Sequence, residues 1–121
     1  MDGHAWAREF PGAITVCDAQ GVILEMNAAA EEVFAADGGA RLVGRNVLDC
    51  HPEPARTKLK TMLAQGRTNF YTIEKAGKKK LICQAPWTRD GVYAGFVELV
   101  LVIPWEMPHF NREAAKPPGQ T

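Results

Sequence analysis

The alternation of apolar and turn-forming residues near the start of the chain predicts a β-hairpin. Residues 13–17 (AITVC) and 22–26 (VILEM) are mostly apolar, and several are β-branched, as is typical of strands. Between them, residues 18–21 (DAQG) combine an aspartate with a glycine, which favours a tight turn. We therefore expect the fold to begin with two antiparallel strands.

Three more strand-like segments follow in the second half of the chain. They cover residues 69–74, 80–87 and 93–103, and short turns that contain glycine join them. Such short connections are typical of an antiparallel meander. Pro86 has no backbone N–H, so we expect the second of these strands to be irregular near its end.

The stretch between the two groups of strands carries helix signals. Asn27 precedes AAAEEVF, and an asparagine in this position can accept hydrogen bonds from the free N–H groups of a first helical turn. A longer helix is predicted from about Pro52 to Gln65, because proline is tolerated in a first turn and Gly66 suits a left-handed helix end. Its apolar stripe consists of Ala55, Leu59, Met62 and Leu63.

This order of elements predicts an α+β domain with a five-stranded antiparallel sheet and its helices packed on one face. The 121 residues are a one-domain length. We assign residues 1–12 to an N-terminal cap segment, 13–103 to the domain and 104–121 to a flexible, proline-rich tail. Since both faces of the last strand are apolar, we expect the N-terminal segment or a partner subunit to cover the second face of the sheet.

Composition excludes several classes of protein. Fourteen basic and fourteen acidic side chains cancel, so no net field favours nucleic acid as a partner. The chain lacks an apolar run of the roughly 20 residues that a membrane helix needs. Three separated cysteines without a CxxC motif argue against a disulfide framework or a zinc site and favour the reducing cytoplasm.

The sequence shows no apparatus for catalysis. It has no Gly-Xaa-Ser-Xaa-Gly motif and no phosphate-binding loop, and its histidines, His4, His51 and His109, are scattered. We therefore expect a protein that is not an enzyme.

Several short motifs occur in a characteristic order. They are Asp18 to Gly21 with Val22-Ile23-Leu24, Asn27-Ala28-Ala29, Phe34, Gly44-Arg45-Asn46-Val47, and Asp90-Gly91 with Tyr93-Ala94-Gly95. Together they resemble a PAS domain, and the resemblance runs from about Ala13 to Ile103. Cys50-His51-Pro52 is similar to a PAS subfamily that often has Cys-His-Pro before its long helix.

The resemblance implies a sensory, signal-transduction domain. In PAS sensors the helices and the inner face of the sheet enclose a pocket for haem, a flavin or a small metabolite, and we expect a small-molecule ligand here. Signalling would pass through a homodimer or a separate output protein such as a kinase. The candidate pocket residues are Asn46, Cys50, His51, Met62, Phe70, Gln84, Val97 and Leu99. The alternative is a ligand-free protein–protein interaction module that serves for dimerisation.

The cofactor stays open at this point. A haem-based gas or redox sensor would use His51 as axial ligand, although a purely structural role fits this histidine as well. Flavin-binding light sensors of this fold have a cysteine directly after a Gly-Xaa-Asn triplet, where this chain has Val47, so flavin photoadduct chemistry is not expected.

Two polar residues stand in otherwise apolar strands. Gln84 either contacts a ligand or points to water, because a buried amide needs a hydrogen-bond partner. The same alternatives hold for Glu98, with pairing across a dimer interface as a third.

Overall fold

The computed structural model describes residues 5–113. Within them, one five-stranded sheet has the order β2-β1-β5-β4-β3. All neighbouring strands are antiparallel, so the predicted sheet is confirmed. Its strands are β1 (Ala13–Asp18), β2 (Ile23–Met26), β3 (Asn69–Lys75), β4 (Lys78–Arg89) and β5 (Val92–Ile103).

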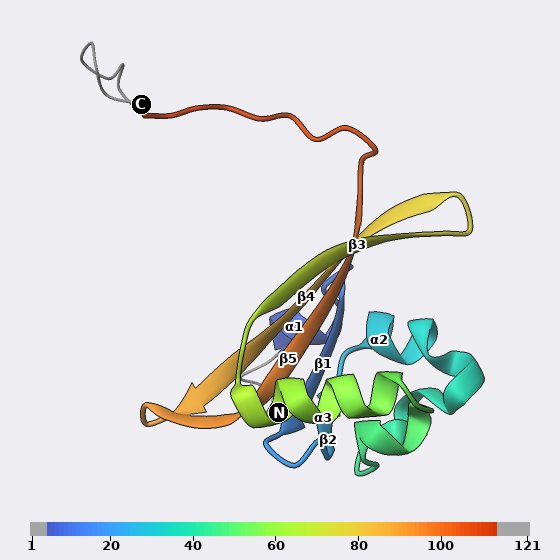
Figure 1. Cartoon of the computed structure of the whole chain (residues 1–121). Coiled ribbons are helices and arrows are strands. Elements are labelled where there is room, and N and C mark those ends of the chain that lie inside the picture. Colours follow the sequence, from blue (N-terminus) through green and yellow to red (C-terminus); the bar gives the residue numbers. More distant parts are fainter. Residues whose placement is uncertain (1–4, 114–121) are drawn as a thin grey trace.

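The helices between β2 and β3 cover one face of this sheet, which we call the inner face (Figure 1). The short helix α1 lies against the opposite, outer face, where its residues border the same groove as side chains of β1 and β5. The α-helices are α1 (Ala5–Arg8), α2 (Ala28–Val33) and α3 (Ala55–Gln65), and the 3-10 helices are η2 (Ala35–Asp37), η3 (Gly39–Leu42) and η4 (Val47–Cys50).

The predicted hairpin forms between β1 and β2. The carboxylate of Asp18 closes its turn by accepting hydrogen bonds from the backbone N–H groups of Gln20 and Val22, both at 2.9 Å. Gly21 has φ +91°, a left-handed conformation that glycine adopts without steric cost. A short polar side chain and a glycine therefore set the turn, as the sequence indicated.

Helix α3 starts later than predicted, at Ala55 rather than at Pro52. A residue that precedes proline is kept out of the helical region, and this applies to His51 and Glu53. His51 is accordingly extended, with φ −118° and ψ 108°. The predicted end is confirmed, because Gly66 is left-handed and its N–H donates to the carbonyl of Met62 at 3.0 Å.

Strand β4 continues through Pro86 to Arg89, and its irregularity is a register shift between Trp87 and Thr88. Its pairing with β3 ends at Gln84. Beyond that point β5 is its only strand neighbour in the described sheet, so Pro86 lies where β4 has become an edge strand. Prolines in sheets are tolerated at such edges.

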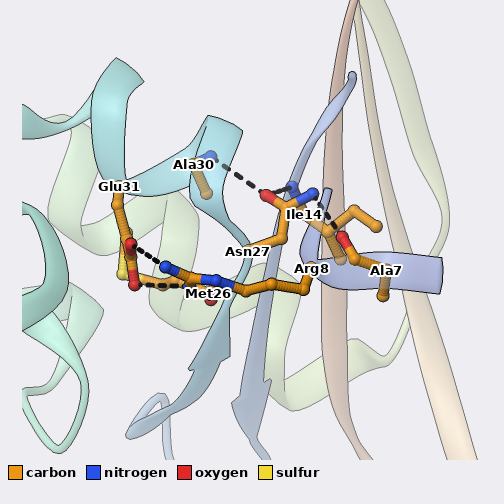
Figure 2. Close-up of polar contacts among 7 residues, drawn as sticks. All are labelled: Ala7, Arg8, Ile14, Met26, Asn27, Ala30 and Glu31. Atoms are coloured by element: carbon orange, nitrogen blue, oxygen red, sulfur yellow. Dashed lines mark hydrogen bonds and ion pairs between the residues drawn. The ribbon is translucent and has the colours of Figure 1, made fainter. Parts of the chain in front are cut away.

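Asn27 joins the N-terminal segment, β1 and α2 (Figure 2). Its side chain is 5% exposed, and its oxygen accepts hydrogen bonds from the N–H groups of Ile14 at 2.9 Å and Ala30 at 3.0 Å. Its amide nitrogen lies within hydrogen-bond distance of backbone carbonyls in the N-terminal segment, including those of Ala7 at 2.9 Å and Gly12 at 2.8 Å. The helix cap predicted at Asn27 is therefore confirmed, and the same residue also anchors the N-terminal segment.

The core consists of two clusters beneath the helices. One lies beside α2 and contains Ala13, Ile23, Met26, Ala30 and Leu42. The other lies beneath α3 and contains Cys17, Leu63 and Phe96.

Strand β1 begins at Ala13 and β5 ends at Ile103, and residues 104–113 form neither helix nor strand. The division into cap, domain and tail stays a prediction, and its residues 1–4 and 114–121 lie outside the described residues. Between residues 5 and 113, no helix has the length and apolar character that crossing a membrane requires.

Candidate functional site

A cavity of about 290 Å³ opens between the inner face of the sheet and the helices. Both core clusters contribute to its wall. Its apolar lining consists of Ile23, Met26, Phe34, Leu42, Val47, Leu59, Met62, Leu63 and Phe96. Its polar and sulfur-containing lining consists of Thr15, Cys17, Asp37, Cys50, His51, Gln84 and Glu98.

A row of polar side chains crosses the inner face from strand to strand. We call it the polar row, and it consists of Thr15 on β1, Glu98 on β5, Gln84 on β4 and Asn69 on β3. Thr15 is the register partner of Glu98, Glu98 of Gln84, and Gln84 of Asn69. All except Asn69 line the cavity.

The hydrogen bonds of the polar row run in one direction. Asn69 Nδ2 donates to Gln84 Oε1 at 3.2 Å, and Gln84 Nε2 donates to Glu98 Oε2 at 2.8 Å. An ionised carboxylate can only accept hydrogen bonds, so Gln84 must turn its NH₂ group to Glu98 and its oxygen to Asn69. The row thus ends in a carboxylate whose orientation is fixed by its neighbour.

The charge of Glu98 also affects Tyr71, two residues along β3 from Asn69. Burial raises the pKa of the Tyr71 hydroxyl, and the negative charge of Glu98 raises it further. A hydrogen bond with the Gln84 side chain opposes both effects. The tyrosine therefore stays a neutral hydroxyl beside the row.

Cys17 contributes a neutral thiol to the cavity wall. Its side chain is 6% exposed, and burial raises the pKa of the thiol above its ordinary value, outweighing a backbone hydrogen bond from Phe96. Since the thiolate is the reactive and metal-binding form, this cysteine is a poor nucleophile and a poor ligand.

The segment around η4 positions His51 and Cys50 at the cavity. Asn46 caps η4, because its Oδ1 accepts from the N–H of Leu48 at 2.9 Å. The Nδ1 of His51 is hydrogen-bonded to the carbonyl oxygen of Val47. A carbonyl only accepts, so Nδ1 carries the proton, and in the neutral ring Nε2 is the nitrogen with a free lone pair.

Four of the eight residues predicted for the pocket line the cavity: Cys50, His51, Met62 and Gln84. Asn46 is not among the lining residues. Its side chain is engaged with Leu48 and with the carbonyl of Gln20, to which Nδ2 donates at 2.9 Å.

Val97 and Leu99 do not lie at the cavity, and their assignment to it was wrong. Side chains alternate between the two faces of a strand, and Glu98 lies on the inner face, so its two neighbours lie on the outer face. Phe70 was also misplaced. It follows Asn69 on the edge strand β3, which puts it on the outer face, where it is 64% exposed.

Among the polar and sulfur-containing lining residues, the eight candidates did not include Thr15, Cys17, Asp37 or Glu98, although a ligand contact was one alternative considered for Glu98. The usable signal was that Glu98 and Gln84 are both polar exceptions in apolar strands. The register explains the coincidence, since the two side chains bond to each other within one chain. Glu98 therefore has a partner without any dimer interface.

Over residues 5–113, no three His, Cys, Asp or Glu side chains lie close enough to hold a metal ion, and His4 lies outside the described residues. Cys17, Cys50 and Cys83 are free cysteines.

A second hollow, with a volume of about 670 Å³, lies on the outer face beside α1. We call it the outer groove, and its lining consists of Ala5, Trp6, Ala7, Arg8, Ile14, Val16, Leu24, Glu25, Met26, Asn27, Trp87, Arg89 and Val97. Trp87 is fixed there, because its Nε1 donates to the carbonyl of Cys17 at 3.0 Å. Trp6 is 72% and Leu24 is 41% exposed, so the groove presents apolar surface to its surroundings.

Comparison with known proteins identifies similar folds. A family model described as PAS fold matches residues 8–76, more than half of the chain. No curated protein matches the sequence.

Three solved structures of similar fold share 20% to 23% sequence identity with this chain. A C-terminal domain from Streptococcus mutans is 23% identical with a TM-score of 0.67, covering 83% of this chain and 81% of that one. The Aer2 receptor from Vibrio cholerae, described as a dual PAS-haem oxygen sensor, is 20% identical with a TM-score of 0.54, covering 77% and 95%. A sensory box sensor histidine kinase from the same organism is 20% identical with a TM-score of 0.57, covering 79% and 85%.

Proposed function

Because the chain belongs to the PAS fold family, we propose that it is a sensory, signal-transduction domain that binds a small molecule in its cavity. The observation that carries the proposal is the cavity itself, which combines a mainly apolar wall with a few polar groups on the sheet. Small-molecule sites in proteins have this composition, with volumes of about 300–1,000 Å³. We propose no catalytic activity for the domain, and a cytoplasmic location.

The signalling mechanism we propose is a population shift. A ligand in the cavity contacts the sheet together with α3 and η4, so it favours whichever packing of these elements binds it better. Met26 borders both the cavity and the outer groove, and the next residue, Asn27, holds the N-terminal segment. A change in packing at Met26 would therefore shift Asn27 and with it the hydrogen bond that holds α1.

We propose that the receiving surface is the outer groove and that a second copy of the chain covers it. The exposed Trp6 and Leu24 favour burial against another apolar surface. A two-fold dimer would bring the same groove of each copy together. An output protein such as a kinase is the other receiver that we consider, since sensor histidine kinases are among the proteins of similar fold.

Occupancy of the cavity can be tested with a matched pair of variants on α3. Met62→Trp fills the cavity, whereas Ala64→Trp adds the same ring at an exposed position on the same helix. A library of small metabolites is screened by thermal shift against the native chain. We expect compounds that stabilise the native chain and Ala64→Trp but not Met62→Trp. If no compound does so, the ligand-binding function is wrong and a ligand-free interaction module is favoured.

Dimerisation has a separate test. Sedimentation equilibrium on the full chain is expected to show a dimer that Trp6→Asp dissociates. Trp105→Asp is the control, because Trp105 is also an exposed tryptophan but is not among the residues that line the groove. A native chain that stays monomeric, or a dimer that Trp6→Asp leaves intact, would contradict the proposed interface.

Haem fits the cavity poorly. His51 lines the wall and carries a free lone pair on Nε2 in its neutral form, which favours an axial ligand. However, the two propionates of haem require positive partners, and the lining has the carboxylates of Asp37 and Glu98 but no lysine or arginine. A Soret band that survives gel filtration of the hemin-treated chain and disappears in His51→Ala would show that haem binds after all.

A further inference from the structure

We propose that the cavity selects small, mostly apolar ligands that carry a positively charged nitrogen, and that Glu98 is the residue that recognises this charge. The inference rests on the proposed ligand-binding function and names the chemical class of the ligand.

The first argument is the charge of the cavity wall. Two carboxylates, those of Asp37 and Glu98, line it, and the lining contains neither lysine nor arginine. His51 is the remaining titratable base in the lining. Charges interact more strongly beside a protein wall than in bulk water, so this cavity attracts cations and repels anions.

The second argument is the position of Glu98. It lies half-buried on the central strand β5 between its register partners Thr15 and Gln84, and the apolar Phe96 precedes it by two residues on the same face. Removing a carboxylate from water is costly unless hydrogen bonds or an opposite charge compensate for it. Between residues 5 and 113, the structure places the Gln84 amide on this carboxylate but gives it no salt bridge.

The third argument is the spare hydrogen-bonding capacity of the site. A carboxylate offers about four acceptor positions, and Gln84 uses one of them. If the Gln84 amide rotated to point its oxygen elsewhere, it would lose the hydrogen bond that Asn69 donates to that oxygen. The Glu98 carboxylate is therefore free to accept hydrogen bonds from a ligand, and an ammonium or amidinium group supplies both N–H donors and a positive charge.

The apolar remainder of the wall defines the rest of the ligand. Leu59 and Met62 of α3 and Phe96 of β5 contribute apolar side chains to this wall. A hydrocarbon or aromatic body of modest size suits this wall and the volume of about 290 Å³. Dicarboxylic acids and flavin nucleotides carry the opposite charge, and the lining offers them no lysine or arginine.

The test uses three probes that share a phenyl body and differ in charge: phenylethylamine, phenylethanol and phenylpropionate. Each is titrated into the isotope-labelled full chain, and binding is measured from NMR shifts of cavity residues. We expect the amine to bind about tenfold more tightly than the alcohol, a factor typical of one partly exposed charge pair, and the carboxylate to bind more weakly than either. Added salt is expected to reduce the preference for the amine.

Glu98→Gln keeps the shape of the side chain and removes its charge. We expect this variant to bind the amine and the alcohol with similar affinity. Glu74→Gln, on the exposed edge strand β3, removes the same charge far from the cavity and should preserve the preference. The ranking of the probes on the native chain needs no variant, so it decides the matter even if Glu98→Gln does not fold.

Other results would overturn the inference. If the alcohol and the carboxylate shift the cavity signals and the amine binds no better, the charge selection is wrong but ligand binding in the cavity stands. If none of the three probes shifts these signals, the inference also fails, and the thermal-shift screen decides the proposed function separately.

Discussion

Arg8 of α1 and Glu31 of α2 form a two-pronged ion pair, in which the guanidinium nitrogens lie 2.9 and 2.8 Å from the two carboxylate oxygens (Figure 2). Arg8 also lies 3.4 Å from the carbonyl of Met26. Helix α1 is therefore held at two residues, Glu31 of α2 and Asn27.

The Arg8–Glu31 pair predicts a pH dependence. The hydrogen bonds and charge of Arg8 lower the pKa of Glu31, so the pair stabilises the fold above the ordinary pKa of a glutamate and loses this effect as pH falls through the lowered value. Thermal unfolding of the native chain and Arg8→Ala should differ slightly near neutral pH and converge in acid, since both side chains are partly solvated. Carbon NMR should show the pKa of Glu31 rising in Arg8→Ala. An unchanged titration of Glu31 would contradict the pairing.

Asn27→Ala should be strongly destabilising. The change leaves the N–H groups of Ile14 and Ala30 and carbonyls of the N-terminal segment without their partner. We expect a loss of at least about 2 kcal/mol in the free energy of unfolding, measured with urea. Asn46→Ala, which removes a less buried cap, is the control and should cost less. Equal losses in the two variants would argue against the anchoring role of Asn27.

Tyr93→Phe removes one hydrogen bond at the end of α3. The Tyr93 hydroxyl donates to the carbonyl of Leu63 at 2.8 Å, in the last turn, where carbonyls have no partner within the helix. We expect a loss of about 1 kcal/mol and faster amide hydrogen exchange near Gly66. Tyr71→Phe is the control, because Tyr71 is 43% exposed and water can replace its partner. A larger effect at Tyr71 would contradict this account.

Gly95→Ala should disrupt the centre of the sheet. A methyl group on Gly95 would collide with the backbone carbonyl of Cys17 on β1, and the glycine has φ +149°. Backbone cannot move aside as a side chain can, so we expect a loss of more than about 3 kcal/mol in urea unfolding. At Gly77, by contrast, a methyl group would meet open space, and the backbone has φ +74°. Gly77→Ala should therefore lose only about 1 kcal/mol, the cost of holding alanine in a left-handed conformation. Similar losses in the two variants would show that β1 and β5 are not so closely apposed at Gly95.

Those parts of the fold that depend on local chemistry were predictable from the sequence. The oxygen of Asn27 reaches an N–H group three residues away, and Gly66 alone supplies the left-handed helix end. The start of α3 was missed because two local preferences of proline compete there. Proline is tolerated in the first turn of a helix, which favoured a start at Pro52. However, the residue before each proline is kept out of the helical conformation, and this delays the start of α3 to Ala55.

The candidate site was only partly predictable, because periodicity shows that two faces exist without showing which one is inside. Both faces of β5 are apolar, so composition could not show whether the face of Val97 or the face of Glu98 is the inner one. The assignment requires the register with β1, which pairs Thr15 with Glu98. Phe70 was misjudged because its exposure depends on β3 being the edge of the sheet.

The arrangement around Asn27 also determines how the domain opens locally. A single side chain holds the amides of Ile14 and Ala30 and the carbonyls that precede β1. Helix α1 is held by the amide nitrogen of the same side chain whose oxygen caps α2. We therefore expect the N-terminal segment, the start of β1 and the start of α2 to open together as one unit of local unfolding, because one buried side chain orders all three.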